Sequence, residues 1–135
     1  MAEIVLTNAQ VYVNAVDLSD HVRSVTLNVN GEIHDKTFMG STWRKRVAGL
    51  KDWSASVEYN QDFAASKVDA THFSLVGGTT YKLQVWAAST VAGAGNVQYS
   101  GPVLVESYAP VGNAVGELAT VTIPYTGAGT LTRAT

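Results

Sequence analysis

The sequence contains no cysteine among its 135 residues, so no disulfide can stabilise the fold or indicate its redox compartment. Charged residues are also scarce, at 15% compared with roughly 25% in average soluble domains. So low a charge content leaves a more neutral surface than a free monomer needs. It is typical of a chain largely covered by partners, and also of extracellular β domains. The net charge of −2 provides no general positive field for nucleic acid.

Long apolar runs are missing as well. No stretch of 18 apolar residues occurs, so we expect no membrane-spanning helix and no membrane partner. The first four residues, MAEI, lack the basic and apolar regions that begin a secretion signal. Because 46% of the residues are apolar, there is enough material for a core. The length predicts a single domain over residues 1–135.

The dominant hydrophobic period is two, which is typical of strands with one buried face. This alternation, or a short apolar run, predicts strands near residues 4–7, 10–13, 25–29, 53–59, 81–85, 97–108 and 119–125. Asn30-Gly31 lies between two such runs and predicts a hairpin turn. Pro102 and Pro124 interrupt strand patterns, and since proline cannot donate to a ladder, we expect bulges or edges there.

One segment changes to a helical period. Its apolar face is formed by Val68, His72, Leu75 and Val76, which predicts a helix over about residues 66–76. Ser66 and Asp69 have the form of a capping box, and Gly77 follows as a stop. We therefore predict a mainly β fold of two packed antiparallel sheets, either a β-sandwich or a partly open barrel. One short α-helix flanks it, and a long hairpin arm spans about residues 31–50.

The sequence carries few signs of catalysis. His21, His34 and His72 have no second His or Cys at metal-ligand spacing, and His72 is expected to be a core or interface residue. The acidic pairs Asp17/Asp20 and Asp62/Asp69 are typical of turns and caps. No Gly-x-Ser-x-Gly elbow or dinucleotide fingerprint occurs. We therefore expect no enzyme, no catalytic residues, no cofactor and no metal site.

The only dense basic run is Trp43-Arg44-Lys45-Arg46, in the long segment between two strand regions. An aromatic ring beside three cations can contact a nucleic acid, but three charges are few and the chain is slightly acidic. We favour an exposed arm that contacts the acidic surface of a neighbouring subunit. The predicted subunit-interface residues of this arm are Met39, Trp43, Arg44, Lys45 and Arg46.

Two pairs of sequence blocks carry a resemblance. The first pair is VDLSDHVRSVTL at residues 16–27 and RVAGLKDWS at 46–54; the second is VLVESYAP at 103–110 and GAGTLTRAT at 127–135. Together they resemble the major tail (tail tube) protein family of tailed bacteriophages, from about residue 4 to the C-terminus. The resemblance implies two packed sheets with a flanking helix and an arm. It also implies rings of six subunits that stack into a tube.

The function expected from this resemblance is a virion structural protein, the tail tube subunit of a siphovirus-type phage. Its partners would be copies of itself, other phage tail proteins, and genomic DNA that passes through the tube without sequence-specific binding. It would be made in the host cytoplasm and reside in the virion tail. A capsid-decorating or head–tail joining protein with the same fold is an alternative, because fold alone does not separate these roles. A carbohydrate-binding β-sandwich module using Trp43, Trp53 and Trp86 is another.

Overall fold

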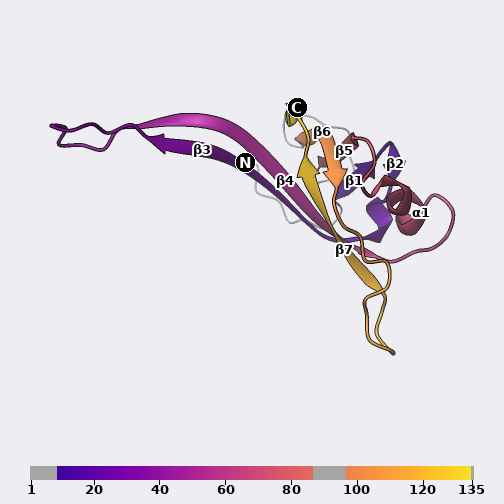
Figure 1. The fold of residues 1–135 in the computed structure, drawn as a ribbon. Helices are drawn as coiled ribbons and strands as arrows, with labels where there is room; N and C mark the ends of the chain where they lie inside the picture. The colour runs from indigo at the N-terminus through magenta and orange to yellow at the C-terminus, as the bar shows by residue number, and fades with distance from the viewer. Residues whose placement is uncertain (1–8, 87–96, 135) are drawn as a thin grey trace, which may run out of the picture.

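The computed structural model describes residues 9–86 and 97–134 of the chain (Figure 1). Its elements in chain order are β1 (Gln10–Val13), β2 (Val16–Asp17), the 3-10 helix η1 (Ser19–His21), β3 (Val22–Asp35), β4 (Arg46–Asn60), α1 (Val68–His72), the 3-10 helix η2 (Phe73–Leu75), β5 (Tyr81–Trp86), β6 (Gln98–Val105), β7 (Thr120–Gly127) and β8 (Thr132–Ala134). The strand expected at residues 4–7 lies outside the described residues. No helix in the described ranges is long and apolar enough to cross a membrane.

The described strands form one antiparallel sheet in the order β2-β1-β5-β6-β7-β4-β3, with β8 paired to β6. The mainly β class with one short α-helix is therefore confirmed, and the two expected sheets are joined into one continuous sheet. Val25 and Leu27 of β3 border the same apolar pocket as Val85 of β5, although these strands are far apart in the strand order. Because sheet twist accumulates from strand to strand, the sheet curls into a partly open barrel.

The core lies inside this curl. Alternate residues of the central strands are buried, as the period of two predicts: Val11, Val13, Trp53, Ala55, Val57, Tyr59, Tyr81, Leu83, Val103, Val105, Val121, Ile123 and Tyr125. Val68 and His72 of α1 are fully buried against them. The apolar run at residues 103–105 indicates cover on both faces of β6, but the Leu104 side chain on the outer face is 38% exposed. The outer face of β6 at Leu104 is therefore left open to solvent by the described residues.

Both prolines lie within interior strands of the sheet, so the predicted bulge or edge positions are not found. Pro102 pairs with Lys82 of β5 and Pro124 pairs with Ser56 of β4, and neither pairing has a register shift. Each proline lies at a gap in the pairing on its other side. Pro102 falls between the β6 residues that pair with β8 and those that pair with β7, and its carbonyl accepts from the Ala128 N–H at 2.9 Å, while Pro124 lies one residue beyond the pairing of Tyr125 with the end of β6.

The helix is shorter than the predicted residues 66–76, and the predicted capping box is wrong. Lys67 is the N-cap residue without a side-chain cap, and Ser66 adopts a left-handed backbone with φ of +60°. The carbonyl of Asp62 instead accepts from the Asp69 N–H at 3.1 Å, so the preceding loop supplies the cap. The Asp69 carboxylate accepts from the Tyr108 hydroxyl at 2.9 Å, a tertiary contact that local sequence spacing does not encode.

The turn predicted at Asn30-Gly31 is also wrong. Both residues lie within β3, where Gly31 pairs with Lys51 of β4. The two strands remain paired as far as Asp35 and Arg46, across an irregularity in register between Gly31 and Ile33. A turn signal is overridden here because the partner strand supplies a continuous ladder past it. The hairpin reverses direction between residues 36 and 45 instead.

A buried hydrogen-bond chain links α1 to the sheet. The Nδ1 atom of His72 lies 2.8 Å from the Val68 carbonyl, its Nε2 atom 2.5 Å from the Tyr125 hydroxyl, and that hydroxyl 2.8 Å from the hydroxyl of Tyr59. Burial lowers the pKa of His72, so the ring is neutral. Because a carbonyl only accepts, Nδ1 donates to Val68, Nε2 accepts from Tyr125, and Tyr59 donates to Tyr125.

We predict that Tyr125→Phe destabilises the fold more than Tyr59→Phe. Removing the central hydroxyl leaves both the His72 Nε2 acceptor and the Tyr59 donor buried without a partner, at a cost of about 2–4 kcal/mol. Removing the Tyr59 hydroxyl interrupts only the end of the chain, at a cost of about 1 kcal/mol. Urea denaturation of the two variants measures this order, and equal losses would contradict the proposed proton arrangement.

Candidate assembly surface

Strand β4 changes its partners halfway along its length. From Ser54 to Tyr59 it pairs with β7 on one side and with β3 on the other, and Asn60 pairs with β7. From Arg46 to Trp53 it pairs with β3 alone. Residues 28–52, here called the arm, therefore form a two-stranded ribbon in which neither edge has a partner strand among the described residues. Figure 1 shows this ribbon extending well beyond the rest of the sheet.

Trp53 fixes the root of the arm. Its side chain is 4% exposed, and its Nε1–H donates to the carbonyl of Gly129 at 2.8 Å. Gly101 and Gly127 make room for the indole, since a Cβ atom on either would lie 2.7 Å or less from a ring atom. The ring is thus held between β6, the end of β7 and the segment that leads to β8. The arm leaves the sheet at this anchored position.

The arm has no core of its own. Residues 28–40 and 42–52 are all exposed, and the large apolar side chains among them are Val29, Ile33, Phe38, Met39, Trp43, Val47 and Leu50. Met39 is 99% exposed and Trp43 is 82% exposed. An isolated two-stranded ribbon is at best marginally stable in water. Exposed apolar surface of this extent is typical of a protein–protein contact.

The arm tip, residues 35–46, contains the five residues predicted from sequence. Its backbone is held by internal bonds, including those from the Lys36 N–H to the Lys45 carbonyl and from the Lys45 N–H to the Thr37 hydroxyl, both 2.8 Å. Arg44 pairs with Asp35 at 2.9 Å, and the Lys45 ammonium lies 4.6 Å from the Phe38 ring centre. An ordered turn therefore holds Met39 and Trp43 out in solvent.

Sequence reasoning found Met39 and Trp43 but missed three exposed apolar residues nearer the root of the arm, Val29, Ile33 and Leu50. Val29 was assigned to the buried face of a strand, but β3 continues beyond the sheet that would cover it, and Val29 is 60% exposed. Ile33 and Leu50 lie on the ribbon beyond Trp53, at 69% and 77% exposure. The pattern of apolar residues alone does not reveal where along a hairpin the supporting sheet ends. Only the pairing of β4 with β7 decides that point.

A second projection is the β6–β7 loop, residues 106–119, which Figure 1 shows leaving the sheet in a different direction from the arm. The Asn113 side chain accepts from the Thr120 N–H at 3.0 Å, and the Glu117 carboxylate accepts from the Ala114 N–H at 3.0 Å. Gly116, with φ of +92°, completes this turn. The loop exposes three large apolar side chains: Val111, Val115 and Leu118.

The candidate acid–base residues are arranged as structural contacts. His21 is held between Asp20 and Asp62, with nitrogen–oxygen distances of 2.7 and 2.8 Å. Since both ring nitrogens are engaged by carboxylates, neither is free to accept a proton from a substrate. Asp17 accepts from the Ser19 N–H at 2.9 Å, as turn chemistry predicts. Within residues 9–86 and 97–134, no group of three or more acidic or His residues could hold a metal ion.

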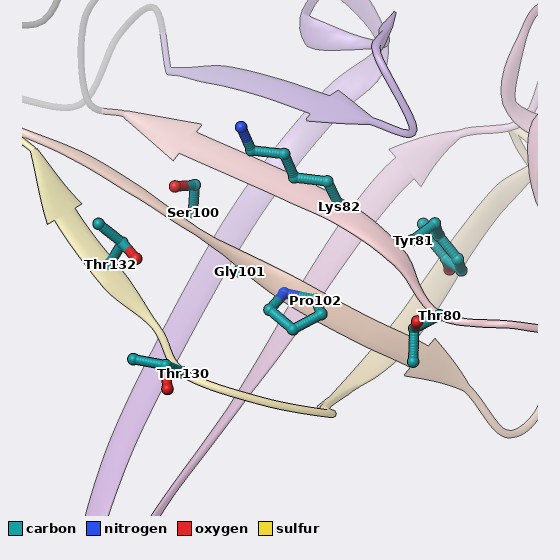
Figure 2. Close-up of a pocket in the computed structure, with 8 residues that line it drawn as sticks. All are labelled: Thr80, Tyr81, Lys82, Ser100, Gly101, Pro102, Thr130 and Thr132. Atoms are coloured by element: carbon teal, nitrogen blue, oxygen red, sulfur yellow. The ribbon is translucent and has the colours of Figure 1, made fainter.

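One open groove lies on the outer face of β5, β6 and the segment around β8 (Figure 2). Its exposed polar side chains come from Thr80, Lys82, Ser100, Thr130 and Thr132. These supply hydroxyls and one amine, without a carboxylate or an imidazole, and Tyr81 contributes to the wall while its hydroxyl is buried. The tryptophans do not form a sugar platform there, because Trp53 is buried and Trp43 lies at the arm tip.

The fold and these surfaces define a partly open β-barrel with two projecting, partly apolar segments. The sequence matches no protein family and no curated protein. Several solved structures share the fold, among them three that align with most of this chain. The first is a virion of a native gene transfer agent particle, with 20% identity, a TM-score of 0.72 and coverage of 95% of this chain and 96% of that chain. The second is a tail of an empty gene transfer agent particle with C6 symmetry, with 24% identity, a TM-score of 0.65 and coverage of 85% of this chain and 83% of that chain. The third is the sheath/tube terminator of an extracellular contractile injection system, with 9% identity, a TM-score of 0.76 and coverage of 100% of this chain and 99% of that chain.

These identities are low, so the likeness is one of fold. It nevertheless extends over almost the whole chain in two of the three cases. The fold implied by the resemblance to phage tail tube proteins is thus also the fold of chains from gene transfer agent particles and from a contractile injection system.

We predict that Gly127→Ala destabilises the protein by about 1–3 kcal/mol, because the added methyl would lie 2.6 Å from both the indole nitrogen and the carbonyl of Trp53. Gly112→Ala is the matched control, since no atom lies within 4 Å of its added methyl, and should change stability by less than about 0.5 kcal/mol. Chemical denaturation compares the two variants. Equal effects would show that Trp53 is not tightly held.

The His21 contacts predict a pH-dependent contribution to stability. Partial burial by itself lowers the pKa of His21, but the hydrogen bonds and charges of Asp62 and Asp20 together raise it above 6.5. The stabilisation is therefore fully present below that pH and is lost as the pH rises through the folded-state pKa. We expect His21→Gln to destabilise the protein more at about pH 5.5 than at about pH 8.5. NMR titration of the imidazole measures the pKa directly, and a value below 6.5 would contradict this account.

Proposed function

We propose that this chain is the tail tube subunit of a tailed bacteriophage, assembling into stacked rings that form a conduit for genomic DNA. The observation that carries the proposal is the arm: an exposed ribbon with apolar side chains whose edges beyond Trp53 have no partner strand within residues 9–86 and 97–134. Such a ribbon requires a partner that this chain, within its described residues, does not supply. The shared fold with particles that have tails favours other copies of the chain as that partner.

The proposed mechanism is passive self-assembly. Among the described strands, β3 is the end strand of the sheet, and its 14 residues have no partner there on the outer edge, which can extend the sheet into a neighbouring copy. The predicted interface residues of the tip, Met39, Trp43 and Arg44 to Arg46, would contact that neighbour. Contacts between different surfaces of identical subunits produce closed rings or helical tubes. A ring of six is favoured because a structural neighbour, the gene transfer agent tail, has C6 symmetry.

The role is structural rather than catalytic, without a cofactor, in a siphovirus-type tail. The partners are sibling subunits and other tail proteins, and the DNA passes without sequence-specific binding. The overall charge of −2 suits a conduit that must not retain nucleic acid. Synthesis in the host cytoplasm followed by incorporation into the virion is part of the same proposal.

A ring-forming joining or terminating protein is the second candidate. It is favoured by the full-length likeness to a sheath/tube terminator structure, whose TM-score is 0.76. Such a protein would form single rings that do not stack. Stacking therefore separates the two candidates experimentally, as would binding to purified phage heads for a capsid-decorating protein.

We predict that the purified chain forms six-fold rings and hollow tubes visible by negative-stain electron microscopy. Met39→Ser combined with Trp43→Ser should abolish them, because it removes the two most exposed apolar side chains of the arm tip. Since these side chains contribute nothing to the core, circular dichroism and unfolding of the variant should remain unchanged.

Thr42→Ser is the matched control, as it alters an exposed residue of the same turn and should leave assembly intact. A chain that stays monomeric at high concentration would refute the proposed function. Rings that never stack would favour the joining or terminating role instead.

A further inference from the structure

The two projections of this molecule carry opposite charges. The arm tip has four basic residues, Lys36, Arg44, Lys45 and Arg46, and one acidic residue, Asp35, for a net charge of +3. The β6–β7 loop has two acidic residues, Glu106 and Glu117, and no basic residue, for a net charge of −2. Within the described residues, Arg44 is the one tip cation with an ion pair, to Asp35, and Lys45 lies over the Phe38 ring, so Lys36 and Arg46 have neither contact. Opposite fields of this kind steer and orient association.

The arm tip and the β6–β7 loop also expose large apolar side chains that no neighbouring part of the described chain covers. Val115 is fully exposed and Val111 is 81% exposed, while the internal bonds of Asn113 and Glu117 hold the loop in shape. At the arm tip, Met39 and Trp43 are exposed in a similarly bonded turn. Each projection therefore presents an apolar centre with charges beside it, which is the usual composition of a protein contact.

One copy cannot join these two surfaces by itself, because the arm and the loop leave the sheet in different directions (Figure 1). The remaining strongly exposed aromatic residues near α1 are a weaker match. Phe63 and Phe73 are 61% and 72% exposed, but Lys67 lies between them in the sequence and reduces the acidic character of that segment. The loop is thus the best complement to the tip in charge and in apolar content.

We propose that the arm tip of one copy docks on the β6–β7 loop of another copy of this chain. The contact joins two different surfaces, so each copy uses its tip toward one neighbour and its loop toward a second. Lys36 and Arg46 face Glu106 and Glu117, and Met39 and Trp43 cover Val115 and Leu118. This inference rests on the proposed self-assembly and names the acceptor surface for the arm.

The absence of cysteine allows a direct test by crosslinking. In the double variant Met39→Cys, Val115→Cys, both thiols replace almost fully exposed side chains. Mild oxidation of assembled protein should give a ladder of dimers, trimers and larger species on non-reducing gels, since every copy carries both halves of the contact. Met39→Cys with Phe73→Cys is the matched control and should give no ladder. A ladder from the control alone, or dimers only from the 39/115 pair, would overturn the proposal.

A charge exchange tests the same contact without oxidation. The tip variant Lys36→Glu, Arg46→Glu and the loop variant Glu106→Lys, Glu117→Gln should each raise the concentration needed for assembly by about tenfold or more. The glutamine side chain introduced by Glu117→Gln retains an oxygen that can accept from the Ala114 N–H, so the turn is preserved. Combining all four substitutions reverses both surfaces and should restore assembly to within about threefold of the original chain.

The outcomes separate this inference from the proposed function. If the original chain forms tubes but the loop variant assembles equally well, or the combined variant is no better than the single-surface variants, the docking contact is wrong and the tube function stands. If the original chain never assembles under any condition, both are wrong. Sedimentation velocity at several concentrations provides the measurement.

Discussion

The partner change of strand β4 at Trp53 is the constraint on which the rest of the molecule depends. Beyond Ser54, β4 is a central strand with neighbours on both sides, and its alternate residues build the core. Before that point it is half of an unsupported ribbon. Because Trp53 is buried between Gly101 and Gly127 and hydrogen-bonded to Gly129, the body holds the ribbon at a fixed root. One strand thus runs from the packed core of the domain into an exposed two-stranded ribbon.

The body of the domain contains the buried core, whereas the arm exposes its side chains to solvent. The body is closed by α1, where the buried His72, Tyr125 and Tyr59 satisfy one another in a chain of hydrogen bonds. The arm contributes no buried residue between positions 28 and 52. Its ladder is ordered locally, but its apolar side chains face water, an arrangement that is costly for a monomer and favourable for an assembly. A domain built this way can lose its arm contacts without losing its core, which suits subunits that fold first and assemble later.

The comparison with known structures is consistent with this division. A likeness over nearly the full chain at 9 to 24% identity means that different sequences maintain the same curled sheet. In this chain, packing of the curled sheet requires the alternation of buried residues and the strand order. The charges and apolar residues of the projections are not needed for packing, so they are free to differ between proteins and to select partners.

The sequence by itself determined the β class and the buried faces of residues 53–59, 81–85 and 121–125. Those features depend on the two-residue period, which is a local property. The tertiary structure alone decided where the hairpin leaves the sheet, why Asn30-Gly31 is not a turn, and why Ser66 does not cap the helix. Each of these depends on a partner distant in sequence: β7 for the root of the arm, β4 for the Asn30-Gly31 ladder, and the Asp62 carbonyl for the start of α1. Local spacing carries no information about such partners, because the same residues are compatible with either arrangement until the neighbouring strand is in place.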